Sequence, residues 1–365
     1  MNENNINFIK NNQMKNWYKI FFSKLKKASF YDNDSPKKII GFGLGFSLMK
    51  SNHNFMHLDK KTITDAYKKS NHNLIIIENN LLLQALEENN TYQKENIIYQ
   101  LKTLASQEKN KIYIISGDTK SEVEQNLKDI LPDIGISYEY GFYYIKPREQ
   151  IIRQTYYLRD WSWKQAIIPI LKGFTERTEG SYIIEKESMI NWVYKNCYSD
   201  FGQFQANEMI SHIKTLLFQN NSIIVEDDSE KNMVNIRPKN VNKGYFIAEI
   251  LKQEKINGKF PEMILVIGDR DGGEEMFKYL NYLKYCYNEI QSEIISAIVP
   301  NRVSSANYYF NEVSEIWENI ETFNKIDKNE DISSSNTIQD VYNMIEQSND
   351  YELEILSQDN NFDNE

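Results

Sequence analysis

Short apolar runs that alternate with helical patterns are the feature that most constrains the fold of this chain. Three runs read LIII, KIYII and EMILVI, at residues 74–77, 111–115 and 262–267. Apolar runs bounded by polar residues are typical of strands buried on both faces. Helical patterns accompany them at 60–69, 92–107, 119–130 and 243–255. This alternation predicts an α/β fold with a Rossmann-like parallel sheet.

The middle of the chain follows a different pattern. Residues 181–194 alternate between apolar and polar, and a helical pattern covers 203–219. These features predict an inserted α+β domain rather than another strand of the main sheet. We therefore divide the chain into four parts: an N-terminal helix and loose start (1–35), a core (36–141 with 234–325), an inserted cap domain (142–233) and an acidic, disordered tail (326–365).

The net negative charge of the chain comes from its C-terminal tail. Residues 326–365 carry eleven acids and one base, so residues 1–325 hold 41 acids and 41 bases and are neutral. A folded part without net positive charge argues against a nucleic-acid partner. Within the tail, four apolar residues recur at helical spacing and allow a docking helix, although a disordered tail is the simpler reading. These residues are Ile338, Val341, Tyr342 and Ile345.

The N-terminal segment and the cysteines bear on location. Residues 14–27 form a basic amphipathic pattern, which suits a helix docked on the domain or, alternatively, a membrane surface. No apolar run is long enough to span a bilayer, and no secretory signal is visible. The two cysteines, Cys197 and Cys286, lie far apart in no metal-ligand spacing. A reduced, cytoplasmic protein is the expected class.

Polar residues follow the predicted strands where an α/β enzyme places its chemistry. Glu78, Asn79 and Asn80 follow the first strand, and Ser116 follows the second. A hydroxyl at a strand-to-helix turn suits a phosphoryl oxygen, although Ser-Gly is also ordinary turn chemistry. Lys243 begins a helix, where it either neutralises phosphate or is solvated. The third strand runs into GDRDGGEE at 268–275, which suits a Mg²⁺ site or a polar helix start.

Together these segments resemble the haloacid dehalogenase phosphatase superfamily, and within it the trehalose-6-phosphate phosphatases. The resemblance covers about residues 36–315 and is greatest to the C-terminal part of synthase/phosphatase fusion proteins. ISGD at 115–118 is similar to ISGR in the family, and GFTERTEGSYIIEK at 173–186 is similar to YTERTPGS-IE-K. VNIRPKNVNKG at 234–244 and IGDRDGGEEMF at 267–277 resemble VEVRP-gvNKG and IGDDRTDEDMF. The order and spacing of these motifs make a chance match improbable.

The resemblance implies a role for each matching position. The family's first strand ends in DYDGT, whose aspartates act as nucleophile and as general acid and base. Glu78 and Asn80 stand at those positions here. By the same resemblance Ser116 holds the phosphoryl group, Lys243 balances its charge, and Asp269 helps to hold Mg²⁺. The cap residues near Glu139 and Lys186 would contact the sugar, and Lys195 stands where the family has an arginine.

These departures remove most of the chemistry. Glutamate is one methylene too long for an in-line attack, and asparagine supplies no acidic proton. Residues 66–117 contain no aspartate that a shift of register would supply, and Arg270 replaces the second acid of the metal loop. We therefore expect no cofactor, or Mg²⁺ if the protein is active.

Three functions remain open. The first is a catalytically inactive, regulatory or binding subunit of a trehalose-6-phosphate synthase/phosphatase assembly, whose partner is a synthase or phosphatase subunit. It rests on a segment at 36–70 that resembles the junction before the phosphatase in the fusion proteins. The second is an active phosphatase that uses Glu78. The third is a sensor that binds a sugar phosphate without turnover through Ser116 and Lys243.

Overall fold

The computed structural model describes most of residues 55–328 and the backbone of two short antiparallel strands, β1 (Lys37–Ile40) and β2 (Ser47–Lys50). The described ranges are 55–88, 91–127, 132–156, 161–217, 222–229, 231–269, 273–286, 291–300 and 304–328. The helix expected at 14–27 and the docking pattern at 338–345 lie outside them. Within these ranges no helix has the length and apolar character needed to cross a membrane.

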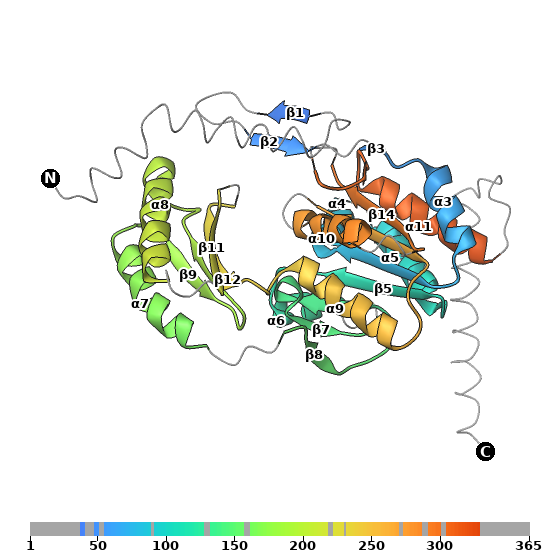
Figure 1. The fold of residues 1–365 in the computed structure, drawn as a ribbon, viewed down its shortest axis with the longest axis horizontal. Coiled ribbons are helices and arrows are strands. Elements are labelled where there is room, and N and C mark those ends of the chain that lie inside the picture. The colour runs from blue at the N-terminus through green and yellow to red at the C-terminus, as the bar shows by residue number, and fades with distance from the viewer. Residues whose placement is uncertain are drawn as a thin grey trace, which may run out of the picture.

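A mostly parallel sheet forms the centre of the molecule (Figure 1). Nine strands take the order β3-β15-β14-β13-β4-β5-β6-β7-β8 in the described part of the chain. All neighbours are parallel except β6 with β7 and β7 with β8. The predicted α/β fold with a parallel sheet is therefore confirmed. The strands are β3 (Met56–His57), β4 (Asn73–Glu78), β5 (Asn110–Ile115), β6 (Gly135–Tyr138), β7 (Tyr143–Ile145), β8 (Ile152–Gln154), β13 (Met263–Gly268), β14 (Glu293–Ile298) and β15 (Tyr308–Tyr309).

Helices cover both faces of this sheet, which explains why the strands β4, β5 and β13 at its centre carry long apolar runs. Along β4, Ile75 and Ile77 pack into the core on one face, while Leu74 and Ile76 pack into the core on the other. The first face is covered by α3 (Lys60–Lys69), α4 (Asn79–Glu88), α5 (Thr91–Ser106), α6 (Lys120–Leu127) and α11 (Ser314–Asp327). The second face is covered by α9 (Lys243–Ile256) and α10 (Gly273–Cys286).

A separate antiparallel sheet of four strands lies beside the main sheet, with two helices packed on one face (Figure 1). Below, "the cap" denotes this unit, residues 161–238. Its elements are α7 (Ser162–Glu176), β9 (Tyr182–Glu185), β10 (Ile190–Val193), α8 (Ser199–Leu216), β11 (Ile223–Asp228) and β12 (Met233–Pro238). Helix α8 begins earlier than expected, at Ser199, with Asp200 in its first turn, where the helix dipole favours an acid. The first strands of the segment expected as the cap, β7 and β8, instead extend the main sheet.

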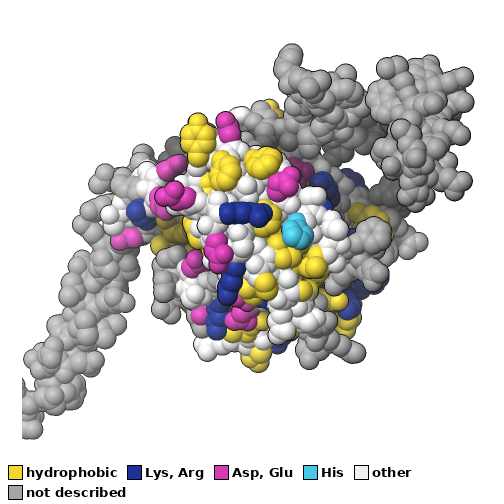
Figure 2. Space-filling view, turned by 90° about the vertical axis from the view of Figure 1, so that its left-hand side faces the viewer, with side chains coloured by type: hydrophobic (Ala, Val, Ile, Leu, Met, Phe, Trp, Pro, Cys, Tyr) yellow, Lys and Arg dark blue, Asp and Glu magenta, His cyan; other side chains and the backbone are white. Residues whose placement is uncertain are grey.

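Figure 2 shows the outer side of the cap, on which apolar side chains gather near the upper part. The exposed aromatic residues at the start of α8 are Tyr198, Phe201 and Phe204, which are 80%, 44% and 57% exposed. Acidic and basic side chains are mixed over the rest of this view. This mixture agrees with the neutral charge of residues 1–325.

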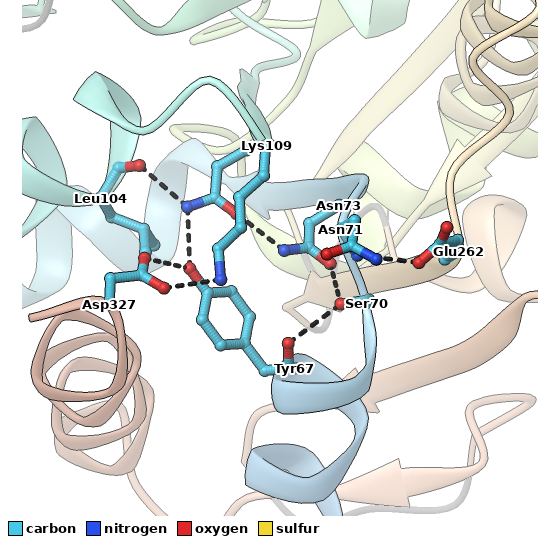
Figure 3. A network of polar contacts seen from close by, with 9 residues as sticks. Tyr67, Ser70, Asn71, Asn73, Leu104, Lys109, Glu262 and Asp327 are labelled. Carbon is cyan, nitrogen blue, oxygen red and sulfur yellow. Dashed lines mark hydrogen bonds and ion pairs between the residues drawn. The ribbon is translucent and has the colours of Figure 1, made fainter. Parts of the chain in front are cut away.

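A polar network lies at the amino ends of β4 and β5 (Figure 3). The Asn73 amide donates to Asn110 Oδ1, and the Asn110 amide donates to the Tyr67 hydroxyl, both at 2.8 Å. The Tyr67 hydroxyl donates to Asp327 Oδ2 at 2.6 Å, and the Lys109 ammonium lies 2.6 Å from the same carboxylate. Asp327, the last residue of α11, is thereby bound at the amino ends of β4 and β5.

Candidate functional site

The candidate site lies where the order of the parallel strands reverses. Strand β4 pairs with β5 on one side and with β13 on the other, and ligands bind at such a reversal beyond the carboxyl ends of the strands. Strand β4 ends at Glu78, β5 is followed by Ser116, and β13 is followed by Asp269. The parallel register, with Ile77 opposite Ile267, brings these three ends to one edge.

Glu78 and Lys243 form an ion pair at the centre of this edge. Their side chains are 1% and 4% exposed. Glu78 Oε1 faces the Lys243 ammonium, and Glu78 Oε2 accepts a hydrogen bond of 2.8 Å from the Asp269 backbone N–H. Lys243 is the first residue of α9, whose start is fixed by the Asn242 side chain accepting from the Tyr245 N–H. Both oxygens of the carboxylate are therefore engaged inside the protein.

The two asparagines after Glu78 face different neighbours. The Asn80 amide donates to Asp269 Oδ2 at 2.6 Å. The Asn79 amide lies 3.5 Å from the Ser116 hydroxyl, at the limit of a hydrogen bond. Asparagine at position 80 thus acts as a neutral donor to the carboxylate of Asp269.

The Ser116 hydroxyl is engaged by its own turn. It donates to Asp118 Oδ2 at 2.8 Å and accepts from the Asp118 backbone N–H at 3.1 Å. Ser116 itself is 2% exposed. Asp118 stands where the family resemblance has arginine, so a carboxylate lies beside the serine expected to bind phosphate.

Tyr140 lies over this turn in an unusual backbone conformation. Its φ of 59° and ψ of 30° are left-handed, and Glu139 and Gly141 on either side also have positive φ. Its ring lies against Gly117, since a Cβ built there would be 3.0 Å from two ring atoms. The Lys243 ammonium is 5.4 Å from the ring centroid. Burial raises the pKa of Tyr140, so the phenol stays neutral beside the lysine.

Arg237 is a site residue that the sequence reasoning missed. Its guanidinium donates to Val241 O at 2.5 Å, and to Glu275 Oε1 at 2.6 Å in the first turn of α10. It also pairs with Glu226 at 3.1 Å. These contacts fix the loop that leads to Lys243. The signal available in the sequence was its place in the VNIRPKNVNKG motif.

The expected sugar-contact residues join the cap to the main sheet. Glu139 Oε2 accepts from the Ser188 N–H at 2.7 Å and from its hydroxyl at 2.5 Å, while Oε1 accepts from the Glu187 N–H at 3.2 Å. The Lys186 ammonium donates to Gly117 O at 2.8 Å, beside Ser116. The structure thus brings Glu139 and Lys186 to the candidate site.

Lys195 lies at the other end of the cap strands. It is exposed and follows β10, in which Ile190 pairs with Glu185 near the site and Val193 pairs with Tyr182 at the far end. Three residues of strand separate the two ends, or about 10 Å. The structure does not bring Lys195 together with Glu139 and Lys186.

The described residues do not fit a Mg²⁺ ion, which takes oxygen ligands. Among the described residues three carboxylates lie at these strand ends, and each already accepts a hydrogen bond, Asp118 from the Ser116 hydroxyl. Glu78 accepts from the Asp269 N–H and pairs with Lys243, while Asp269 accepts from Asn80. The described part of the chain contains no group of three or more His, Cys, Asp and Glu that could hold a metal. Arg270, expected to oppose metal binding, lies outside the described residues.

Comparison with known protein families identifies the group to which this chain is related. The model of the trehalose-phosphatase family matches residues 82–314. The chain belongs to the trehalose-phosphatase family. The matched residues include Ser116, Lys243 and Asp269, and they begin after Glu78, Asn79 and Asn80.

Relatives of this trehalose-phosphatase family member include longer plant and amoebal proteins. The chain is 29% identical over 301 residues to the "Probable alpha,alpha-trehalose-phosphate synthase [UDP-forming] 10" of Arabidopsis thaliana, covering 82% of the chain and 34% of the relative. It is 34% identical over 180 residues to the "Alpha,alpha-trehalose-phosphate synthase [UDP-forming] B" of Dictyostelium discoideum, covering 49% of the chain and 22% of that protein. The chain spans about a third of the Arabidopsis relative.

Solved structures of the trehalose-phosphatase type share the fold. The C-terminal domain of the Candida albicans trehalose-6-phosphate phosphatase has a TM-score of 0.61 and 22% identity, covering 76% of this chain and 99% of that one. The C-terminal domain of the Candida albicans trehalose synthase regulatory protein has a TM-score of 0.58 and 15% identity, covering 73% and 99%. At these identities the likeness concerns the fold, and it confirms the expected haloacid dehalogenase-like architecture.

Proposed function

We propose that this chain is a non-catalytic member of the trehalose-phosphatase family that serves as a regulatory or binding subunit in trehalose-6-phosphate metabolism. The observation that supports this most strongly is the buried ion pair of Glu78 with Lys243. A carboxylate nucleophile must reach phosphorus in line, and a misplacement of about 1 Å costs roughly 100-fold in rate. Glu78 is 1% exposed and both its oxygens have partners.

Asn80, two residues after Glu78, also supports the proposal that the chain is non-catalytic. General acid and base catalysis contributes about 10²–10⁴ to the rate of such reactions. Asn80 has no acidic proton, and its amide donates to Asp269. The carboxylates described at the site also do not fit a metal ion. The chain therefore lacks the nucleophile, the general acid and base, and the metal site of the family's reaction, and it keeps only the residues that would hold a phosphate.

The proposed partner is a trehalose-6-phosphate synthase or phosphatase subunit. The relatives matched over 82–86% of the chain are described as trehalose-phosphate synthases. One solved structure with the same fold belongs to a protein described as a trehalose synthase regulatory protein. The test is affinity purification of the full chain from its native cells, with a variant carrying Glu78→Ala beside it. The proposal expects a synthase-family protein in both samples, and its absence from both counts against this partner.

A phosphate-release assay tests the inactivity. Wild type and Glu78→Ala are incubated with trehalose 6-phosphate and Mg²⁺, and both are expected to match the blank. Release by wild type that disappears in Glu78→Ala, while circular dichroism shows that the variant is folded, would show an active phosphatase with Glu78 as nucleophile. Equal release by both proteins would point to a contaminating phosphatase, which repurification separates from the chain.

Two lysines retained at the site favour a second candidate function, a sensor that binds a sugar phosphate without turnover. Lys243 lies at the strand edge and Lys186 reaches Gly117 beside Ser116. Calorimetric titration with trehalose 6-phosphate tests this candidate, with Lys243→Met as the control. Saturable binding that needs Lys243 supports the sensor, and no heat at millimolar ligand rejects it.

A further inference from the structure

The residues expected to hold a phosphate are shielded from solvent. Ser116, Lys243 and Glu78 are 2%, 3% and 1% exposed as whole residues. A phosphate held by Ser116 and Lys243 would have to touch both side chains, and solvent scarcely reaches either of them. Among the described residues, Tyr140 lies close to both positions and is itself only partly buried. Its side chain therefore forms part of the cover over this edge of the sheet.

The Tyr140 ring lies where the turn after β5 meets two cations. A Cβ built on Gly117, next to Ser116, would be 3.0 Å from two ring atoms and 3.3 Å from the phenol oxygen. The Lys243 ammonium is 5.4 Å from the ring centroid, and the guanidinium carbon of Arg237 is 6.0 Å from it. The ring thus takes up the space that a ligand would need in order to contact the turn and the cations together.

The same ring partly replaces an anion as a neighbour of these cations. The face of an aromatic ring carries partial negative charge and attracts a cation within about 6 Å of its centroid. Lys243 and Arg237 both lie within that distance. Burial raises the pKa of Tyr140, so the phenol stays neutral. The ring therefore attracts both cations without bringing the full charge that a phosphate would bring.

The backbone around Tyr140 is held in a conformation that few side chains adopt. Glu139 and Tyr140 have φ angles of 46° and 59°, and Gly141 follows with 90°. Successive non-glycine residues in this region persist only where their surroundings fix them. The Tyr140 N–H donates to Ser116 O, and the Glu139 N–H donates to Asp118 O, both at 2.9 Å. These bonds tie the ring to the turn that it covers.

The residues on either side of Tyr140 are fixed by two other parts of the fold. Glu139 accepts a hydrogen bond of 2.7 Å from the Ser188 N–H in the cap. Gly141 packs on α9, where an added Cβ would collide with the Phe246 side chain. The Tyr140 ring can therefore leave its place only if the contacts with the cap or with α9 loosen.

We propose that Tyr140 closes the candidate site to anions, so that the residue at position 140 decides whether a phosphate can enter. The inference rests on the proposed function in one respect, because it takes Ser116 and Lys243 as the groups that would hold a phosphate. It deepens that function by assigning the loss of access to one side chain, separately from the loss of the nucleophile. A smaller residue at position 140 should restore anion binding without restoring hydrolysis.

Calorimetric titration of the full chain with inorganic phosphate tests the proposal. Tyr140→Asn is the test variant, because asparagine tolerates the left-handed backbone and removes the ring. Tyr140→Phe is the matched control, since it keeps the ring and removes only the hydroxyl. Tyr140→Asn should bind phosphate at least tenfold more tightly than wild type, and Tyr140→Phe should stay within twofold of wild type.

A further variant locates the bound phosphate. Glu78→Gln and Lys243→Met are added together to Tyr140→Asn, which removes the cation without leaving its partner charged. These changes should abolish the gain in affinity, because the phosphate would lose a cation that it contacts.

Three results would overturn the proposal. The first is that Tyr140→Asn, shown by circular dichroism to be folded, binds phosphate no more tightly than wild type. The second is an equal gain in Tyr140→Phe, which would assign the effect to the hydroxyl instead of the ring. The third is a gain that survives the loss of Lys243, which would place the anion elsewhere. If Tyr140→Asn does not fold, Tyr140→Gly takes its place, because glycine adopts positive φ without strain.

Failure of this inference can be told apart from failure of the proposed function. Tyr140→Asn is also incubated with trehalose 6-phosphate and Mg²⁺, and its phosphate release should match the blank, because Glu78 and Asn80 are unchanged. Release that requires Glu78 would refute the non-catalytic proposal while supporting closure of the site by Tyr140. A blank result together with unchanged phosphate affinity would refute the closure alone.

Discussion

Glu78 and Lys243 face one another across the switch point of the sheet, in an ion pair that solvent scarcely reaches. Glu78 ends β4 and Lys243 begins α9, so the pair joins the central strand to a helix on one face of the sheet. Breaking a buried pair by removing one partner leaves the other charge buried and costs about 3–5 kcal/mol. Removal of either side chain alone should therefore destabilise the ends of the strands that meet here.

Removal of either partner should destabilise the protein more than removal of both. Glu78→Ala and Lys243→Met each leave an uncompensated charge, so each should lower the free energy of unfolding by about 3–5 kcal/mol. The double variant should lose less than either single variant, since neither charge remains buried without a partner. Urea unfolding of the wild type, the two single variants and the double variant measures these free energies. Lys252→Ala is the exposed control, because the Lys252 side chain is 68% exposed and its i,i+3 pair with Glu249 should contribute less than about 1 kcal/mol. Additive losses would show that the two side chains are not coupled.

The Tyr140 ring explains why residue 117 is glycine. An added Cβ would lie 3.0 Å from two ring atoms, closer than ordinary contact. Gly117→Ala should therefore cost about 1–3 kcal/mol of overpacking in the wild-type background. In a Tyr140→Asn background the cost should nearly vanish, because asparagine tolerates the left-handed backbone without filling the space. Chemical denaturation of the four proteins measures this, and an equal cost in both backgrounds would contradict it.

The hydrogen bonds to Glu139 should hold the cap against the main sheet. Ser188→Ala removes the hydroxyl donor and leaves the two backbone donors, so a loss of about 1–2 kcal/mol is expected. The change should also speed amide hydrogen exchange at Glu187 and Ser188. Tyr143→Phe, which removes an exposed bond to Glu187, is the control and should alter exchange there less. Unchanged exchange in Ser188→Ala would mean that Glu139 does not restrain this loop.

Tyr67 should make the stability depend on pH in the alkaline range. Burial first, and then the bond to Asp327, raise its pKa above the ordinary value of 10.0. Because the pKa is higher in the folded state, its contribution is complete below pH 10 and falls as pH rises above the unfolded value. Tyr67→Phe should lose stability at pH 7 and show a shallower decline above pH 10 than wild type. Thermal unfolding between pH 7 and 11 measures both, and parallel curves would contradict the assignment.

Much of the fold could be predicted from local sequence pattern. The runs at 74–77, 111–115 and 262–267 became β4, β5 and β13, because burial on both faces requires apolar residues at every position. The ends of these strands also indicated which polar residues would meet at one edge. The extension of the main sheet by β7 and β8 was not predicted, since three-residue strands carry too little periodicity.

The sequence by itself determined the layered α/β architecture and the chemical groups near the strand ends. Only the tertiary structure decided what those groups contact: Glu78 pairs with Lys243, Glu139 binds the backbone of the cap, and the Tyr140 ring lies on Gly117. The physical reason is the range of the forces involved. Periodicity reports the environment of neighbouring residues, whereas partners distant in sequence are selected by burial, which makes an unpaired charge or donor costly.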